Sequence, residues 1–252
     1  MKSMLSRFIA VAMILLSSQT IAQGRASGQI EWLVGDLPPF AWKEGNKPRG
    51  YGVDLISAMA GRMGRSVDIS PVPWARAVAT TREGDHYGVL PLARTPDRED
   101  QFRWLIKLTQ VRYTFFAHRK QEGAAHINDI DALRTRKIGV LRGSPIINNL
   151  QAGRFTQIVT ATNYNDLLRL LELGAIDAAY AGQPMFLAAI RQTSFPENDF
   201  VTGASLGSAD LYLGASLKLD GEEAERWVNA YKALLNDGTV AKLRRRYDLP
   251  AL

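Results

Sequence analysis

Residues 88–98 read Gly88-Val89-Leu90-Pro91-Leu92-Ala93-Arg94-Thr95-Pro96-Asp97-Arg98, an apolar run that passes directly into a Thr-Pro turn. The segment 89–92 predicts a buried strand. In open α/β sheets ligands bind outside the carboxyl ends of the strands, so Arg94 and Arg98 stand where a ligand would sit. Each guanidinium offers a planar fork of donors that matches a carboxylate. Taken alone, the stretch leaves open that one or both arginines are solvated surface charges.

Working outward, strands and helices alternate along most of the chain. Expected strands cover residues 30–35, 67–70, 89–92, 137–141 and 175–180. Expected helices cover residues 54–63, 74–82, 146–150, 166–172 and 222–236, and a last helix ends at Tyr247. Asn165 is the expected N-cap of the helix 166–172. This alternation predicts an α/β fold with largely parallel sheets. The strands form two separate series, and the extended runs 111–118 and 211–216 lie between or after them. We therefore expect two lobes joined by two crossing strands.

The first residues are typical of an export signal. Lys2 and Arg7 precede an apolar run, Phe8 to Leu16, that is too short to span a bilayer. Small residues at Thr20 and Ala22 predict cleavage before Gln23, which makes residues 1–22 a signal peptide. An uncleaved anchor is the alternative.

The composition excludes several kinds of chemistry. The chain has no cysteine, which excludes disulfides, thiolate metal sites, a cysteine nucleophile and the lipid-modified cysteine of lipoproteins. We therefore expect a soluble periplasmic protein. The formal net charge of +6 loses two positive charges with the signal peptide, and this mild excess gives no reason to expect nucleic acid. His86, His118 and His126 show no metal-ligand spacing, so we expect neither a metal nor a cofactor.

Six motifs in sequence carry a resemblance to a known family. They are Pro39-Phe40; Gly50-Tyr51-Gly52-Val53-Asp54-Leu55; Thr95-Pro96-Asp97-Arg98 with Phe102; Lys137-Ile138-Gly139-Val140 with Gly143-Ser144; Leu171-Glu172-Leu173-Gly174-Ala175-Ile176-Asp177-Ala178; and Asp237-Gly238-Thr239 to Tyr247. In this order they resemble the bacterial extracellular solute-binding proteins, family 3, which feed amino-acid ABC transporters. Pro73-Trp74-Ala75-Arg76-Ala77 is typical of a divergent subgroup.

The resemblance implies a type II periplasmic-binding-protein-like fold, in which two lobes close on a ligand. Each lobe is a mostly parallel sheet flanked by helices. On this chain, lobe 1 would comprise residues 30–117 and 213–252, and lobe 2 residues 118–212. Closure of this kind is a population shift driven by contacts that the ligand makes in the closed state. The implied partners are a small organic ligand and an ABC permease or membrane sensor, and we expect a monomer.

The resemblance assigns the ligand carboxylate to Arg98. Arg94 could serve instead, or it could pair with Glu99 or Asp100 on the surface. Ser144 follows Gly143 where a strand passes into a helix, and free N–H groups there favour an anion. A helix N-cap is the alternative role for Ser144.

Several other residues are expected around the cleft. Phe40, Trp42 and Trp74 are candidates for apolar walls, since an aromatic face can stack on a planar group or hold a cation. Core packing is the alternative for Phe40 and Trp74. Asp36 ends the first strand and could accept a ligand donor or cap the adjacent turn.

One departure from the family pattern concerns the ligand ammonium group. Amino-acid-binding members carry an aspartate shortly after the strand that ends here at Tyr180, and Gly182 occupies that position. A buried ammonium without a carboxylate partner is costly. Tyr180 and Gln183 could supply neutral hydrogen bonds. We therefore expect an organic anion rather than an ordinary α-amino acid.

Two other functions compete with solute binding. An enzyme on the same fold, similar to cyclohexadienyl dehydratase, would need a positioned acid or base in the cleft, and Gln183 cannot titrate. A purely structural interaction protein is the third possibility. The sequence favours a non-catalytic binding protein.

Overall fold

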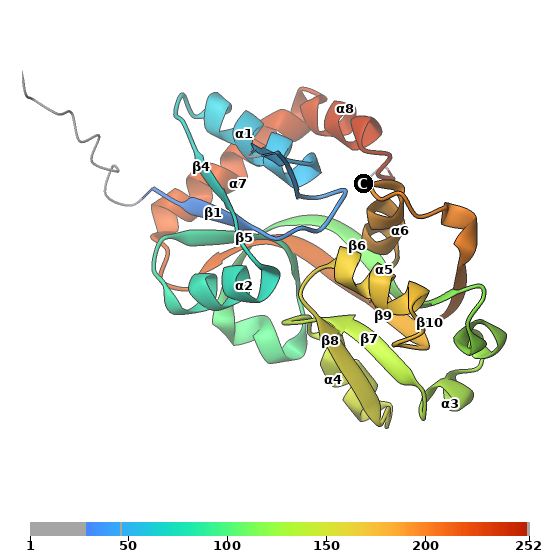
Figure 1. The fold of residues 1–252 in the computed structure, drawn as a ribbon. Coiled ribbons are helices and arrows are strands. Elements are labelled where there is room, and N and C mark those ends of the chain that lie inside the picture. The colour runs from blue at the N-terminus through green and yellow to red at the C-terminus, as the bar shows by residue number, and fades with distance from the viewer. Residues whose placement is uncertain (1–28, 46, 251–252) are drawn as a thin grey trace, which may run out of the picture.

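A computed structural model describes residues 29–45 and 47–250. One eight-stranded sheet runs through the molecule in the order β4-β1-β5-β10-β6-β9-β7-β8 (Figure 1). Its strands are β1 (Glu31–Val34), β4 (Asp68–Pro71), β5 (Tyr87–Ala93), β6 (Phe102–His118), β7 (Lys137–Leu141), β8 (Gln157–Ala161), β9 (Ala178–Gly182) and β10 (Phe200–Ser216). A separate hairpin pairs β2 (Trp42–Glu44) with β3 (Lys47–Arg49).

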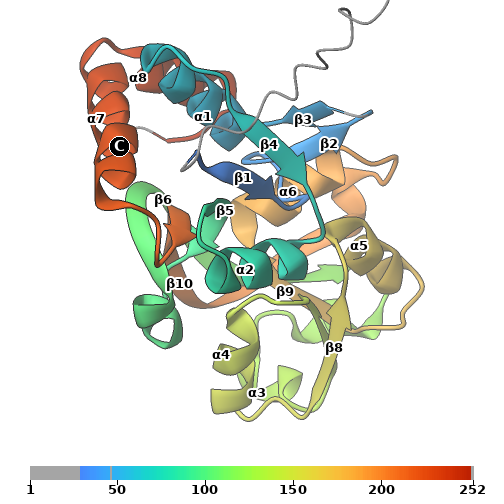
Figure 2. The same cartoon turned by 90° about the vertical axis from the view of Figure 1, so that its left-hand side faces the viewer.

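The helices divide between the two ends of this sheet. Lobe 1 holds β4, β1 and β5 with α1 (Tyr51–Arg62), α2 (Trp74–Glu83), α7 (Gly221–Asn236) and α8 (Thr239–Arg246) (Figure 2). Lobe 2 holds β9, β7 and β8 with α3 (Ile130–Leu133), α4 (Ile146–Ala152), α5 (Tyr164–Glu172) and α6 (Gln183–Arg191). Short 3₁₀ helices are η1 (Pro96–Gln101), η2 (Glu122–His126) and η3 (Glu197–Asp199).

The strands within each lobe are parallel, and two long strands join the lobes. β1 pairs in parallel with β4 and β5, and β7 does so with β8 and β9. β6 and β10, each of 17 residues, are antiparallel to one another and cross from one lobe to the other. Their pairing shifts register between Thr202 and Ser208 and again between Leu211 and Gly214. The two-lobed α/β prediction with two crossings is confirmed; the boundaries at residues 117/118 and 212/213 stay predictions.

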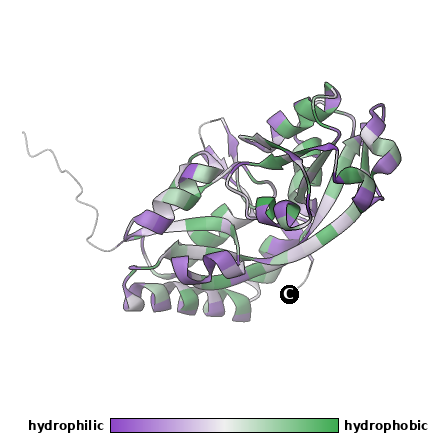
Figure 3. Ribbon diagram, turned by 90° about the horizontal axis from the view of Figure 1, so that it is seen from below, coloured by the Kyte–Doolittle hydropathy of each residue, from purple (hydrophilic) through white to green (hydrophobic). Residues whose placement is uncertain are grey.

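Each lobe is held together by buried aromatic and aliphatic side chains. In lobe 1, Trp32 meets Trp227 edge to face with centroids 5.1 Å apart. Where the crossing strand β6 pairs with β9, Phe116 stacks on Phe186 of α6 at 4.3 Å. Helices on the surface alternate hydrophilic and hydrophobic residues (Figure 3), because each buries one face on the sheet. Burial of such rings contributes more than any surface interaction to the stability of a domain.

The structure corrects some predicted elements. α5 begins earlier than expected, because Asn163 and not Asn165 is its N-cap: the Asn163 side chain accepts the backbone N–H of Asp166 at 2.8 Å. β6 and β10 extend well before residues 111 and 211, since each crosses both lobes. β8 and α6 were not predicted at all.

The predicted signal peptide, residues 1–22, lies outside the described residues. Within the part of the chain that the structure describes, no helix has the length and apolar character needed to cross a membrane.

Candidate functional site

A cleft follows the contact between the two lobes as three neighbouring cavities. The mouth, of about 230 Å³, is bordered by Asp36, Trp42 and Trp74 of lobe 1 and by Thr162 and Asn163 of lobe 2. The chamber behind it measures about 30 Å³ and shares Trp74 and Leu141 with the mouth. The back cavity, of about 420 Å³, shares Ser144 and Pro145 with the chamber. Residues from both lobes line every part.

Arg98 borders the back cavity, which adjoins the chamber through the shared residues Ser144 and Pro145. β5 ends at Ala93, and η1 turns the chain so that the Arg98 side chain returns toward the end of the strand and is 7% exposed. Its guanidinium donates to the Ala93 carbonyl of lobe 1 at 3.4 Å and to the Gly143 carbonyl of lobe 2 at 2.8 Å. Burial lowers the pKa of this guanidinium, but an arginine remains a cation under all physiological conditions.

The charge of Arg98 has no carboxylate partner within ion-pair distance among residues 29–45 and 47–250. Its hydrogen-bond partners are carbonyl oxygens. A buried cation of this kind is an incomplete pair, and a ligand carboxylate would supply the missing charge.

Arg94 takes the surface role that the sequence left open. Its side chain is 38% exposed, pairs with Glu99 and lies over the rings of Trp104 and Tyr212. The pair with Glu99 raises the pKa of Arg94 further above its already high value. Arg94 does not border any of the three cavities, so a ligand role for it stays a prediction.

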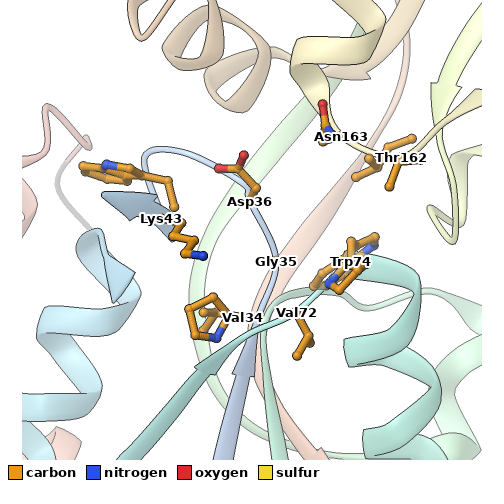
Figure 4. A pocket seen from close by; sticks show the side chains of 12 residues that line it. Val34, Gly35, Asp36, Lys43, Val72, Trp74, Thr162 and Asn163 are labelled. Atoms are coloured by element: carbon orange, nitrogen blue, oxygen red, sulfur yellow. The ribbon is translucent and has the colours of Figure 1, made fainter. Parts of the chain in front are cut away.

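The mouth brings together Asp36, Trp42 and Trp74 as expected (Figure 4). α2 begins at Trp74, and its ring sits on Gly35, where an added Cβ would lie 3.0 Å from the ring. Asp36 is exposed, yet the cleft walls partly desolvate its carboxyl group and raise its pKa. Thr162 and Asn163 of lobe 2 face these residues across the cavity.

Gly143 and Ser144 form the lobe 2 side of the inner cleft. Gly143 has φ +78°, and a Cβ there would lie 3.0 Å from Cα of Ala75 in lobe 1, so glycine allows the close approach of the lobes. Ser144 borders the chamber and the back cavity, as expected for a ligand contact. It does not cap α4, whose N-cap is Pro145 without a side-chain hydrogen bond.

Three expected site residues lie elsewhere. Phe40 is fully buried in lobe 1 and packs on Tyr51 at 6.3 Å. Tyr180 is fully buried in lobe 2, where it stacks on Phe115 at 4.7 Å and donates to the Leu206 carbonyl. Gln183 begins α6 but borders none of the cavities described. Phe40 and Tyr180 are therefore part of the core, because burying a large ring is more favourable than exposing it in the cleft.

Tyr113, Tyr164 and Met185 border the chamber but were not predicted. Tyr113 comes from β6, opposite Gly182 in the register of the sheet. Strand alternation from the expected run 111–118 could have assigned it to one face, but that pattern does not say which face meets the cleft. Met185 belongs to α6, which the sequence did not predict.

A model of the bacterial extracellular solute-binding proteins, family 3, matches residues 33–249. The arginine-binding extracellular protein ArtP of Bacillus subtilis (strain 168) is 22% identical over 242 residues, which cover 89% of this chain and 88% of that protein. An ancestral arginine-binding protein bound to glutamine superposes with a TM-score of 0.76 at 21% identity, over 88% of this chain and 98% of the other. A histidine kinase sensor domain with similarity to periplasmic binding proteins superposes with a TM-score of 0.77 at 23% identity, over 88% of this chain and 97% of the other.

Proposed function

The chain belongs to the bacterial extracellular solute-binding proteins, family 3, and on this basis we propose that it captures a small carboxylate-bearing solute between its lobes. Hinge closure traps the solute in the periplasm, and the closed protein passes it to an ABC permease or presents it to a membrane sensor. The protein binds its ligand without converting it.

The observation that carries this proposal is the buried guanidinium of Arg98. Its two recorded partners are carbonyl oxygens, one from each lobe. A carboxylate that enters beside it forms charge-assisted hydrogen bonds, which are roughly twice as strong as neutral ones. The largest contribution to the binding free energy of the ligand therefore comes from Arg98, where the two lobes meet.

Contacts across the cleft support closure as the mode of capture. Asn148 of lobe 2 donates to Asp97 of lobe 1 at 3.2 Å, and Gly143 lies against Ala75. The chamber, at about 30 Å³, has room for two or three water molecules. A solute of metabolite size therefore enters only when the lobes separate, and contacts with both lobes then favour the closed state. β6 and β10 are the segments that would bend.

The known relatives are consistent with a carboxylate ligand. ArtP is an arginine-binding protein and the ancestral protein holds glutamine, and both of these ligands carry a carboxylate. One similar structure is the sensor domain of a histidine kinase. We therefore propose a membrane sensor as an alternative partner to an ABC permease.

The placement of the histidines favours binding over catalysis. His86 is exposed, His118 packs on Phe200 at the end of β6, and His126 lies in η2. None of the three borders the cavities described here. The enzyme alternative is tested by incubating the protein with prephenate or arogenate, and a measurable rate of product formation would contradict a purely binding role.

Substitution of the two neighbouring arginines tests the proposal. The solute that co-purifies with the protein is identified by native mass spectrometry, and its affinity for Arg98→Ala and Arg94→Ala is measured by calorimetry. We expect Arg98→Ala to weaken binding by about tenfold to a hundredfold, the loss of a hydrogen-bonded charge. Arg94→Ala is the matched control, and its affinity should stay within about threefold of the parent because Arg94 pairs with Glu99 outside the cleft.

A neutral or purely cationic co-purified solute would contradict the proposal. Full affinity in Arg98→Ala, with the variant shown to be folded by circular dichroism, would do the same.

A further inference from the structure

The chamber next to Arg98 is lined by carbon-rich side chains and neutral hydroxyls. Leu37, Trp74 and Leu211 contribute apolar surface, and Tyr113, Tyr164 and Ser144 contribute hydroxyl groups. Within the described part of the chain, no Asp, Glu, Lys, Arg or His side chain borders this chamber. Burial raises the pKa of both tyrosines, so their phenols stay neutral and provide no negative charge.

Gly182 borders the chamber without a side chain of its own. A Cβ on Gly182 would lie 2.3 Å from Cε and 3.1 Å from Sδ of Met185, with Cε1 of Tyr113 beyond at 3.8 Å. The space beside Gly182 is therefore filled by a thioether and an aromatic ring.

These contacts make the chamber a poor site for an ammonium group. A buried ammonium that loses water without gaining a charged partner costs several kcal/mol even after relaxation. Attraction of a cation to the faces of Trp74 and Tyr113 recovers only part of this cost. These rings and the thioether of Met185 pack well on apolar groups, aromatic ones in particular.

We propose that the ligand is an apolar carboxylate, aryl or branched alkyl, that carries no amino group beside its carboxyl carbon. This inference rests on the proposed function, because it places the carboxylate at Arg98. The carboxylate meets the Arg98 guanidinium in the back cavity, where that cavity adjoins the chamber at Ser144 and Pro145. The apolar group lies in the chamber between Trp74, Tyr113 and Met185.

Matched pairs of probes test the inference. The affinities of 3-phenylpropanoate and L-phenylalanine, and of 4-methylpentanoate and L-leucine, are measured by calorimetry on protein freed of bound solute. Each pair differs by one amino group. We expect the acid without the amino group to bind at least tenfold more tightly in one pair or both.

A designed exchange tests the residues that carry the argument. In the double variant Gly182→Asp, Met185→Ala, the side chain that blocks the site is shortened and a carboxylate is added. We expect the preference to shift toward the amino acid by at least tenfold relative to the parent. Met185→Ala alone is the control: loss of the thioether contact should weaken both members of a pair alike, and the preference for the acid should remain because no charge is added.

The outcomes separate this inference from the proposed function. If an amino acid binds as tightly as its acid in both pairs, or if none of the four probes binds, the inference is wrong even if the double variant fails to fold. The proposed function is contradicted only by the separate result, in which the co-purified solute lacks a carboxylate or binds Arg98→Ala with full affinity.

Discussion

Arg94 and Arg98 show how two residues of one type, four positions apart, receive different roles. Both follow β5, yet η1 turns Arg98 inward against Gly143 while Arg94 extends over Trp104 and Tyr212. The sequence placed both at the correct edge of the sheet. It could not separate them, because the difference depends on rings contributed by β6 and β10, and β10 is far away in the chain.

A second buried charge, Glu223 in α7, has a structural role. Its carboxylate is 2% exposed and accepts hydrogen bonds from Arg65, from Arg226 at 3.0 Å and from the Trp227 indole at 2.7 Å. Burial by itself raises the pKa of Glu223, but the bonds from Arg65, Arg226 and Trp227 outweigh it, and the net effect is a lowered pKa.

Replacing Glu223 should destabilise lobe 1 in a pH-dependent way. We expect Glu223→Gln to reduce the free energy of unfolding by about 2 kcal/mol at pH 7, since Arg65 loses its charged partner. A carboxyl whose pKa is lowered on folding stabilises the protein above its unfolded pKa, near 4.5, and the contribution disappears as pH falls through the folded value. Urea unfolding at pH 7 and at pH 4 measures the difference, which should shrink at the lower pH.

Glu222→Gln provides the control for that experiment. Glu222 is exposed and lies 3.6 Å from Arg226, so its replacement should change the free energy of unfolding by less than about 0.5 kcal/mol. Equal effects at Glu222 and Glu223 would show that the buried network contributes nothing specific.

At the scale of elements, local signals located most strands and helices but not their ends. The strand 137–141 was predicted with its observed bounds, because a short apolar run between polar residues is typical of a buried strand. α6 was not predicted, although Pro184 in its first turn is compatible with a helix start, since proline is well accommodated there. The crossing strands β6 and β10 were predicted short, since their lobe-spanning length depends on pairing with one another.

The cap of α5 gives a test at this scale. Asn163 accepts the N–H of Asp166, whereas Asn165 is exposed on the first turn. We expect Asn163→Ala to lower the free energy of unfolding by about 1 kcal/mol, the usual value of an N-cap. Asn165→Ala should be close to neutral, and thermal unfolding of the two variants compares them. A larger loss at Asn165 would place the cap where the sequence first suggested it.

At the scale of the whole molecule, one continuous sheet carries both lobes, and the cleft lies where β5 and η1 meet the loop before α4. The family, the fold and the position of Arg98 could be predicted from the sequence. The chamber lining could not, because Tyr113, Tyr164 and Met185 come from three elements that meet only in the folded chain.

The most direct test of the central claim measures closure itself. The sequence has no cysteine, so Lys47→Cys in β3 and Glu172→Cys in α5 accept a pair of fluorescent dyes, one on each lobe, and energy transfer between them reports lobe separation. The co-purified acid and its methyl ester are titrated into this labelled protein and into the same protein carrying Arg98→Ala. We predict that the acid increases energy transfer only where Arg98 is present, and that the ester does not at matched concentration. Equal closure by acid and ester, or closure by the acid in Arg98→Ala, would contradict the claim that Arg98 holds the ligand carboxylate.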